Sequence, residues 1–184
     1  AIIQGSDRAK TVSKGIEVLG GIGAFIKPGD VVLLKVNAAF ATPALLSATT
    51  HPELISQIIK LCHQAGAKEV HVTDNPINDP SSCFKLTGIG EAVESSGGKL
   101  YLPKEDYFQP YSLKGGKLIT DWPLLYQPLK GVNKVIGVAP LKDHHRSGAS
   151  MTMKNWYGLL GGRRNIFHQD IHTIITELAL MMRP

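Results

Sequence analysis

The sequence predicts an α/β fold, with an open, mostly parallel sheet and helices on both of its faces. Continuous apolar runs of strand length recur along the chain, as in strands that are covered on both sides. Amphipathic segments with helical spacing lie between these runs. An alternation of strands and helices is typical of parallel sheets with right-handed crossovers. Because 184 residues with 43% hydrophobic content suffice for one core, we expect a single domain over residues 1–184.

The first half of the chain alternates between the two kinds of segment. The expected elements are, in chain order, the end of a strand at Ile2-Ile3, a helix with apolar residues from Ala9 to Leu19, a buried strand at 31–37 (VVLLKVN), an amphipathic helix over 51–66 (HPELISQIIKLCHQAG) and a strand at 68–74 (KEVHVTD). Gly66 marks the end of the second helix, since glycine commonly follows a helix.

The second half interrupts the alternation once and then restores it. The expected elements are a broken helix over 81–98, a short strand at 99–103 (KLYLP), a β-hairpin excursion near residues 105–127 that turns at Gly115-Gly116, a buried strand at 134–140 (KVIGVAP), a short helical piece over 151–160 and a final amphipathic helix through 171–180. A proline follows the last helix at Pro184, so we expect the natural chain to continue.

Composition limits the classes of function. The apolar runs are shorter than the roughly 18 residues that a membrane helix needs, so we expect no membrane partner. The chain starts at Ala1 without a methionine, and a soluble protein that stays in the cytoplasm or is exported after loss of a signal segment fits equally well. Cys62 and Cys83 have no C-x-x-C partner, which favours buried or free thiols over a disulfide or a metal pair.

Polar residues follow three of the expected strands. They are Lys35-Val36-Asn37, Asp74-Asn75 and Lys142-Asp143-His144. In open α/β sheets, ligands bind beyond the carboxyl ends of the strands. We therefore expect these side chains to meet at one edge of the sheet.

Lys35 is expected inside the protein, because the alternation of a buried strand places its charge there. An unpaired buried ammonium is costly, so it needs a partner. That partner is either a bound anion or a structural ion pair with Asp74, and the sequence leaves both open. Asn37 either orients a ligand or caps the turn.

The segment Thr50-His51-Pro52-Glu53 has the pattern of a capping box, in which Thr50 caps the helix and Glu53 reaches back. The same helix N-terminus favours an anion. Thr50 and His51 are therefore candidate ligand-binding residues as well as local structural ones.

Positive charge is concentrated late in a chain whose formal net charge is +5. Asp143 is the single acid within a segment that contains Lys142, His144, His145, Arg146, Lys154, Arg163, Arg164 and His168. Such clusters are usually neutralised by a phosphate or carboxylate of a ligand, by nucleic acid or by acids elsewhere in the protein; a flexible, solvated loop is the alternative. Ser150 either binds a ligand or caps the next helix, Lys154 and Asn155 are candidate ligand-binding residues, and Trp156 fits a buried anchor.

Standard catalytic motifs are missing from the sequence. It contains no Walker A motif, no dinucleotide-binding glycine motif and no G-x-S-x-G elbow. A metal site could combine His144 with His51 or His168 and with Asp74, but no H-E-x-x-H spacing supports it. We expect at most one of the adjacent His144 and His145 to ligate, because neighbouring side chains point apart.

Several motifs occur in the order and spacing of a known family. The segments LLKVN, ATTHPEL, QAGAKEVHVTDNP, APLKDHH and MKNWYG, followed by His168, resemble the bacterial and archaeal domain of unknown function 362 family over nearly the whole chain. The resemblance implies an α/β sheet that continues with another strand beyond Pro184. Members of this family are often joined to ferredoxin-like iron–sulfur modules or are exported by the twin-arginine route, so the resemblance also implies a function related to redox chemistry or metals.

The sequence departs from the family's usual motifs at two places. Lys35-Val36-Asn37 replaces the family's lysine-proline-asparagine, and Lys142-Asp143-His144 replaces its lysine-threonine-histidine. Two cysteines cannot supply the four thiolates of an ordinary iron–sulfur cluster, so this chain alone ligates none. Any cluster belongs to a ferredoxin-like partner or fused module.

We therefore expect a ligand-binding domain, preferably an enzyme that acts on a small anionic substrate, with or without a metal. The alternative is a non-catalytic module for a small anion or an iron–sulfur redox partner, and nucleic-acid binding is the least favoured. The expected catalytic residues are His144 and Lys142. His144 is expected to act as general acid/base or metal ligand, and Lys142 to hold and neutralise the anion. The expected ligand-binding residues are Lys35, Asn37, Thr50, His51, Asp74, Ser150, Lys154, Asn155 and His168.

Overall fold

A computed structural model describes residues 1–183 and shows a four-stranded parallel sheet in the order β3-β2-β1-β6. Its strands are β1 (Val31–Lys35), β2 (Glu69–Thr73), β3 (Lys99–Tyr101) and β6 (Lys134–Gly137). Lys35 lies opposite Thr73 on one side and Gly137 on the other, so the carboxyl ends of the three strands are level. The predicted α/β fold, with its open parallel sheet, is confirmed.

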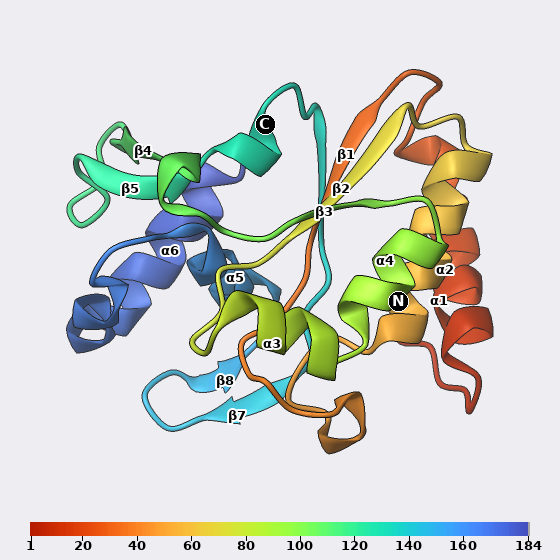
Figure 1. Ribbon diagram of the computed structural model, residues 1–184, viewed down its shortest axis with the longest axis horizontal. Helices are drawn as coiled ribbons and strands as arrows, with labels where there is room; N and C mark the ends of the chain where they lie inside the picture. Colours follow the sequence, from red (N-terminus) through yellow and green to blue (C-terminus); the bar gives the residue numbers. More distant parts are fainter. Residues whose placement is uncertain (184) are drawn as a thin grey trace.

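One face of the sheet packs against the helices of the first half, most of which lie to the right in Figure 1. They are α1 (Arg8–Val18), α2 (Pro52–Gln64), α3 (Pro80–Leu86) and α4 (Ile89–Ser95). Val32 and Leu34 of β1 point to this face and are fully buried with Ile55 and Ile59 of α2. The predicted break between α3 and α4 occurs at Thr87 and Gly88.

The other side of the molecule holds a second core. It contains the hairpin β4 (Phe108–Tyr111) and β5 (Trp122–Leu125), the short helix α5 (Thr152–Asn155) and α6 (Ile171–Met181). Gly137 of β6 has no room for a side chain, since a Cβ there would lie 2.8 Å from the Trp156 ring. The ring is buried, as predicted for an anchor, and it holds the α5 segment against the sheet.

Short turns of 3-10 helix connect these elements. They are η1 (Ile22–Ala24), η2 (Ala44–Leu46), η3 (Glu105–Tyr107), η4 (Gln127–Leu129), η5 (Trp156–Leu159) and η6 (Arg164–Asp170).

Three expectations about the elements are wrong. Ile2 and Ile3 lie outside any strand. β6 is not buried: Val135 is 38% exposed, because β6 pairs only with β1 and forms an edge of the sheet. The basic segment, which was expected to be a loop, contains a second hairpin of β7 (Lys142–His144) and β8 (Gly148–Ser150).

The expectation of buried or free thiols is confirmed. Cys62 and Cys83 are free and buried, and burial raises the pKa of the Cys62 thiol to about 11. Among the described residues, no helix combines the length and the apolar character that crossing a membrane requires.

Candidate functional site

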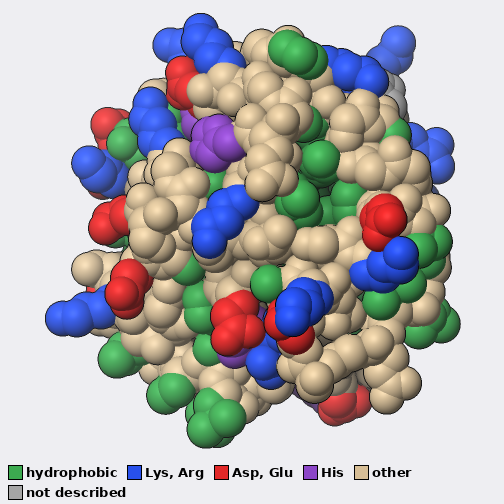
Figure 2. Space-filling view, turned by 90° about the vertical axis from the view of Figure 1, so that its right-hand side faces the viewer, with side chains coloured by type: hydrophobic (Ala, Val, Ile, Leu, Met, Phe, Trp, Pro, Cys, Tyr) green, Lys and Arg blue, Asp and Glu red, His purple; other side chains and the backbone are tan. Residues whose placement is uncertain are grey.

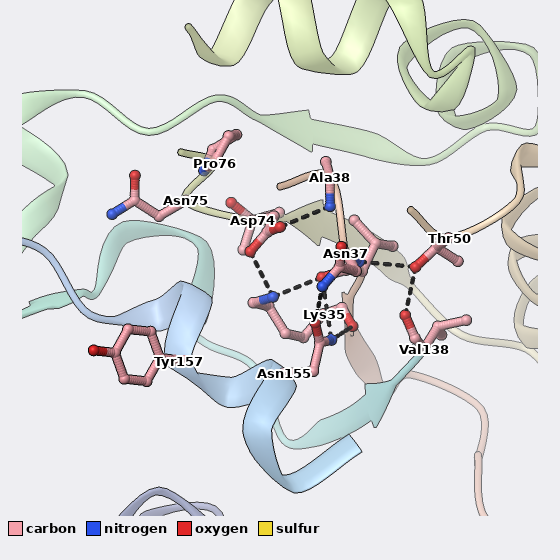
Figure 3. A network of polar contacts seen from close by, with 12 residues as sticks. Lys35, Asn37, Ala38, Thr50, Asp74, Asn75, Pro76, Val138, Asn155 and Tyr157 are labelled. Carbon is pink, nitrogen blue, oxygen red and sulfur yellow. Dashed lines mark hydrogen bonds and ion pairs between the residues drawn. The ribbon is translucent and has the colours of Figure 1, made fainter. Parts of the chain in front are cut away.

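A buried ion pair lies at the carboxyl ends of β1 and β2 (Figure 3). Lys35 Nζ lies 2.6 Å from Asp74 Oδ1, and both side chains are almost completely buried. Lys35 Nζ also donates to the Val36 carbonyl at 2.6 Å, while Asp74 Oδ2 accepts from the Ala38 N–H at 2.7 Å. Burial lowers the pKa of Lys35 and the negative charge of Asp74 opposes this. Of the two partners expected for Lys35, the structure shows the carboxylate.

Gly158 closes over this pair. A Cβ at Gly158 would collide with Asp74 Oδ1 and would lie 2.7 Å from Lys35 Nζ. The Gly158 carbonyl accepts from the Asn75 N–H at 2.9 Å. The close approach requires glycine and locks the segment after α5 onto the end of β2.

Two asparagines join the ion pair to the surface. Asn155 Nδ2 donates to the carbonyls of Lys35 and Val36 at 3.1 and 3.2 Å, and Asn155 Oδ1 accepts from Asn37 Nδ2 at 3.0 Å. Asn37 Oδ1 in turn accepts from Lys142 Nζ at 3.3 Å. Asn37 therefore positions a lysine, a role that neither of its two expected readings included.

The expected capping box is wrong. Thr50 Oγ1 accepts from the Asn37 N–H at 2.8 Å and donates to the Val138 carbonyl at 2.6 Å, so it links the ends of β1 and β6. His51 is the N-cap of α2, and its Nδ1 accepts from the Glu53 N–H at 3.4 Å. Thr50 bonds to these distant groups because the partly buried N–H of residue 37 and carbonyl of residue 138 also need hydrogen-bond partners.

A cavity of about 380 Å³ opens above the ion pair at the carboxyl edge. We call it the carboxyl-edge cavity. Its lining comprises Asn37, Ala39, Phe40, Asp74, Asn75, Ile77, Lys142, Asp143, His144, Ser150, Lys154, Asn155, Tyr157, Gly158, Arg164, Asn165 and His168. Most of the predicted site residues are among them. Lys35 lies beneath the cavity in contact with Asp74, whereas Thr50 and His51 are not part of its lining.

Two lysines bring positive charge to this cavity. Lys142 Nζ donates to the Ala48 carbonyl at 2.7 Å and lies 5.3 Å from the centre of the Phe40 ring. Lys154 Nζ lies 5.4 Å from the Tyr157 ring centre and donates no hydrogen bond within residues 1–183. Burial lowers the pKa of both ammonium groups; Asp74 opposes this at Lys142, whereas the charges of Lys142 and Arg164 add to it at Lys154.

Arg164 also lines the cavity. From the sequence it was counted in the basic cluster, but no role was assigned to it. Its guanidinium donates to four backbone carbonyls, those of Tyr157, Leu160, Asn75 and Pro76. Burial lowers the pKa of Arg164, and the Asp74 carboxylate opposes this. Since the four N–H donors of its terminal nitrogens are engaged, Arg164 mainly contributes charge to the cavity and holds the loop after β2 in place.

Three histidine rings stack beside the cavity, and two of them, His144 and His168, line it. The centre of the His144 ring lies 5.2 Å from that of His145 and 5.7 Å from that of His168. Neighbouring histidines were expected to point apart; here His144 ends β7 and His145 begins its turn, where the alternation of the strand no longer applies. Burial lowers the pKa of His144 and of His168, and the charge of Lys154 lowers both further.

Ser150 is buried at the cavity wall and does not cap α5, whose N-cap is Met151. In the described part of the chain, no group of three or more histidine, cysteine, aspartate or glutamate side chains is placed to hold a metal ion. The combination of His144 with His51 or His168 and Asp74 therefore does not form such a group.

The cavity differs in its charge pattern from the face of α1, α2 and α4. On the face of α1, α2 and α4, positive and negative side chains are interspersed (Figure 2), and Arg8 lies 3.8 Å from Glu53. Within residues 1–183, Lys142, Lys154 and Arg164 form no ion pair with a carboxylate. Three cations without an ion pair in this part of the chain thus line one cavity.

Sequence reasoning missed several lining residues. Asn75 was expected at the carboxyl edge because it directly follows Asp74 at the end of a strand, but it was not named as a candidate ligand-binding residue. Phe40 and Tyr157 carried no such signal, because exposed and buried aromatic residues look alike in a sequence.

Comparison with known proteins gives the chain a family but no reaction. Residues 32–184 match the model of a family described as a domain of unknown function, DUF362. The chain is 29% identical over 153 residues to "Thylakoid-associated protein sll1697" of Synechocystis sp., an alignment that covers 80% of this chain and 44% of that protein. The chain thus spans less than half the length of this relative, and no solved structure matches it. Because the family model covers most of the chain, the protein belongs to the DUF362 family.

Proposed function

We propose that the carboxyl-edge cavity binds a small anion and that the chain is an enzyme domain that acts on it. The observation that carries this proposal is the pair Lys142 and Lys154, which line one cavity without a carboxylate partner in residues 1–183. Like charges held together in a partly buried site repel one another, and a bound anion relieves that repulsion.

The free hydrogen-bond donors identify the groups that would hold the anion. An ammonium has three donors, and Lys154 donates none of them to a group within residues 1–183. Lys142 donates to Ala48 and Asn37 and keeps one donor. Arg164 is occupied by backbone carbonyls. A phosphate or carboxylate would therefore bind to the two lysine ammonium groups, with Arg164 adding charge.

The imidazole groups supply the proposed chemistry. His144 and His168 line the same cavity as the two lysines. Imidazole exchanges protons near neutral pH, and the lowered pKa of both rings keeps them neutral there. A neutral ring next to a bound anion can accept a proton or donate a hydrogen bond, while the lysines stabilise negative charge that develops on the ligand.

Phosphate binding tests the proposal. We expect inorganic phosphate, at constant ionic strength, to raise the melting temperature and to bind in calorimetric titrations. Lys154→Met should weaken binding by about tenfold or more, as expected for the loss of a charge-assisted contact. Lys142→Ala should abolish the increase in melting temperature that phosphate causes.

Lys60→Met is the matched control, since Lys60 is exposed on α2, outside the cavity. Equal phosphate affinity in the Lys154→Met, Lys60→Met and unmodified proteins would contradict the proposal.

Exposed apolar side chains near the cavity favour a second candidate, a binding module for a redox partner. Ile77 lines the cavity and is 68% exposed, and Leu141, next to Lys142, is 75% exposed. Exposed apolar residues beside positive charge suit an acidic protein partner. Titration with a small acidic ferredoxin, compared with the Leu141→Ser variant, tests this candidate; unchanged affinity in that variant would reject it.

A further inference from the structure

The hydrogen bonds of His144 fix the position of its proton. Its Nδ1 lies 3.2 Å from the Ser147 N–H, which can only donate. Ser147 Oγ lies 2.9 Å from the same nitrogen and 2.9 Å from the Ala149 carbonyl, and its single proton can be donated to Nδ1. Nδ1 of His144 is therefore an acceptor, and the neutral ring carries its proton on Nε2.

His168 has the opposite arrangement. Its Nδ1 lies 3.3 Å from the Asn165 carbonyl and 3.1 Å from the Tyr157 hydroxyl oxygen. The Tyr157 hydroxyl donates its proton to the Arg164 carbonyl, with which it is in close contact. Both neighbours of Nδ1 are thus acceptors, so the neutral His168 ring carries its proton on Nδ1 and keeps a lone pair on Nε2.

We propose that the two stacked rings divide the work of the site: His144 offers a hydrogen-bond donor at Nε2 and His168 offers an acceptor and base at Nε2. This inference rests on the proposed anion binding. It assigns the base to His168, whereas the sequence suggested His144. His144 cannot accept a proton at Nε2, which already carries one, and its Nδ1 is held by the Ser147 N–H.

The division defines the class of ligand. The ligand must present an oxygen that accepts from His144 and a hydroxyl that donates to His168, in addition to a negative charge for Lys142 and Lys154. Monohydrogen phosphate and small hydroxy acids have both groups, whereas sulfate has no proton to donate. When such a ligand is activated, its hydroxyl proton passes to His168 Nε2, and the negative charge left on the ligand oxygen is stabilised by Lys154.

Nuclear magnetic resonance tests the tautomers directly. Long-range ¹H–¹⁵N spectra of the labelled protein distinguish the protonated ring nitrogen of each histidine, and His144→Gln and His168→Gln variants assign the two rings. At about pH 7.5, where unperturbed imidazole is neutral, we expect a proton on Nε2 of His144 and on Nδ1 of His168. The same tautomer in both rings would overturn the inference.

Comparison of phosphate with sulfate tests the ligand class. At about pH 7.5 and constant ionic strength, we expect phosphate to bind at least about tenfold more tightly than sulfate. Sulfate carries no proton, so one of its oxygens would face the lone pair on His168 Nε2 without a hydrogen bond. His168→Phe should reduce this ratio to about one. His145→Phe, which changes the outermost ring of the stack, should preserve it.

The outcomes separate the two proposals. Equal affinity for phosphate and sulfate in the unmodified protein would overturn the division between His144 and His168 while leaving anion binding intact. Failure of both anions to bind would overturn the proposed function itself. The comparison in the unmodified protein holds even where a variant fails to fold.

Discussion

At the scale of single residues, the buried pair of Lys35 and Asp74 organises the site. The two charges are 2.6 Å apart and almost fully buried. The Ala38 N–H donates to the Asp74 carboxylate, and Asn155 donates to the backbone carbonyl of Lys35. Taking charges out of water is costly, so each member depends on the other.

Asp74→Asn is therefore expected to destabilise the protein strongly. The change leaves the Lys35 ammonium buried without a counter-charge, with only neutral oxygens such as the Val36 carbonyl as partners. We expect the free energy of unfolding to fall by about 3–5 kcal/mol in urea titrations. Glu17→Gln, which breaks the exposed pair with Lys14, is the control and should cost less than about 1 kcal/mol. Similar losses in the two variants would contradict this account of the pair.

The sequence allowed only part of this to be predicted. Strand alternation placed Lys35 inside, and Asp74 was named as one of two partners. The requirement for Gly158 was not visible, because it comes from a close approach between segments that are far apart in the chain. Such approaches leave no periodic pattern.

At the scale of elements, Thr50 connects the ends of two strands. Its hydroxyl accepts from the Asn37 N–H after β1 and donates to the Val138 carbonyl after β6. The pattern T-x-x-E predicted a local cap, but the three-dimensional neighbours of Thr50 offered better partners. A local sequence pattern predicts only local hydrogen bonds, whereas a buried hydroxyl bonds to the backbone groups that lie nearest in the folded structure.

Thr50→Val should loosen the carboxyl edge. Valine has nearly the same shape but leaves the Asn37 N–H and the Val138 carbonyl without their partner. We expect the free energy of unfolding to fall by about 1–3 kcal/mol, together with faster amide exchange at residue 37. Thr50→Ser retains the hydroxyl and should lose less; an equal loss in both variants would show that packing, not hydrogen bonding, explains the effect.

The main strands and helices were predictable because each buries an apolar face with a regular period. Val32 and Leu34 of β1 and Ile55 and Ile59 of α2 show this pattern directly. The hairpin β7–β8 was missed since Lys142–His144 and Gly148–Ser150 lack both β-branched residues and apolar alternation. The exposure of β6 was missed because a sequence does not reveal which strand forms the edge.

At the scale of the whole molecule, charged side chains are unevenly distributed. Positive and negative groups alternate on the face of α1, α2 and α4, whereas the carboxyl edge gathers cations without carboxylate partners among the described residues. The sequence indicated this cluster, since most of its members lie in one segment. It could not show that the Lys142 and Lys154 side chains share one cavity with residues that follow β1 and β2.

The histidines make stability depend on pH. Burial lowers the pKa of His51, His144 and His168 in the folded protein, aided by Arg8 at His51 and by Lys154 at the other two; Arg146 and His145 also lower that of His168. Below the ordinary value of about 6.5, the unfolded chain therefore binds more protons than the folded one.

We expect the free energy of unfolding to decrease as the pH falls from about 7.5 through 6.5 toward the lowered values. Urea titrations across this range, in buffers without phosphate, measure the slope. Replacing both His144 and His168 by glutamine should reduce it. The carboxylates with lowered pKa, such as Asp79, lose their stabilising effect only at more acidic pH. A stability that stays constant or increases as the pH falls through this window would contradict the account.

The central claim is that Lys142 and Lys154 form one anion site. Anomalous scattering from crystals soaked in arsenate, a phosphate analogue that carries its own proton, tests this claim most directly. The account predicts an arsenic peak in the carboxyl-edge cavity, with arsenate oxygens in hydrogen-bond contact with both lysine ammonium groups. Arsenic bound only elsewhere on the surface, with none between Lys142 and Lys154 at saturating arsenate, would contradict it.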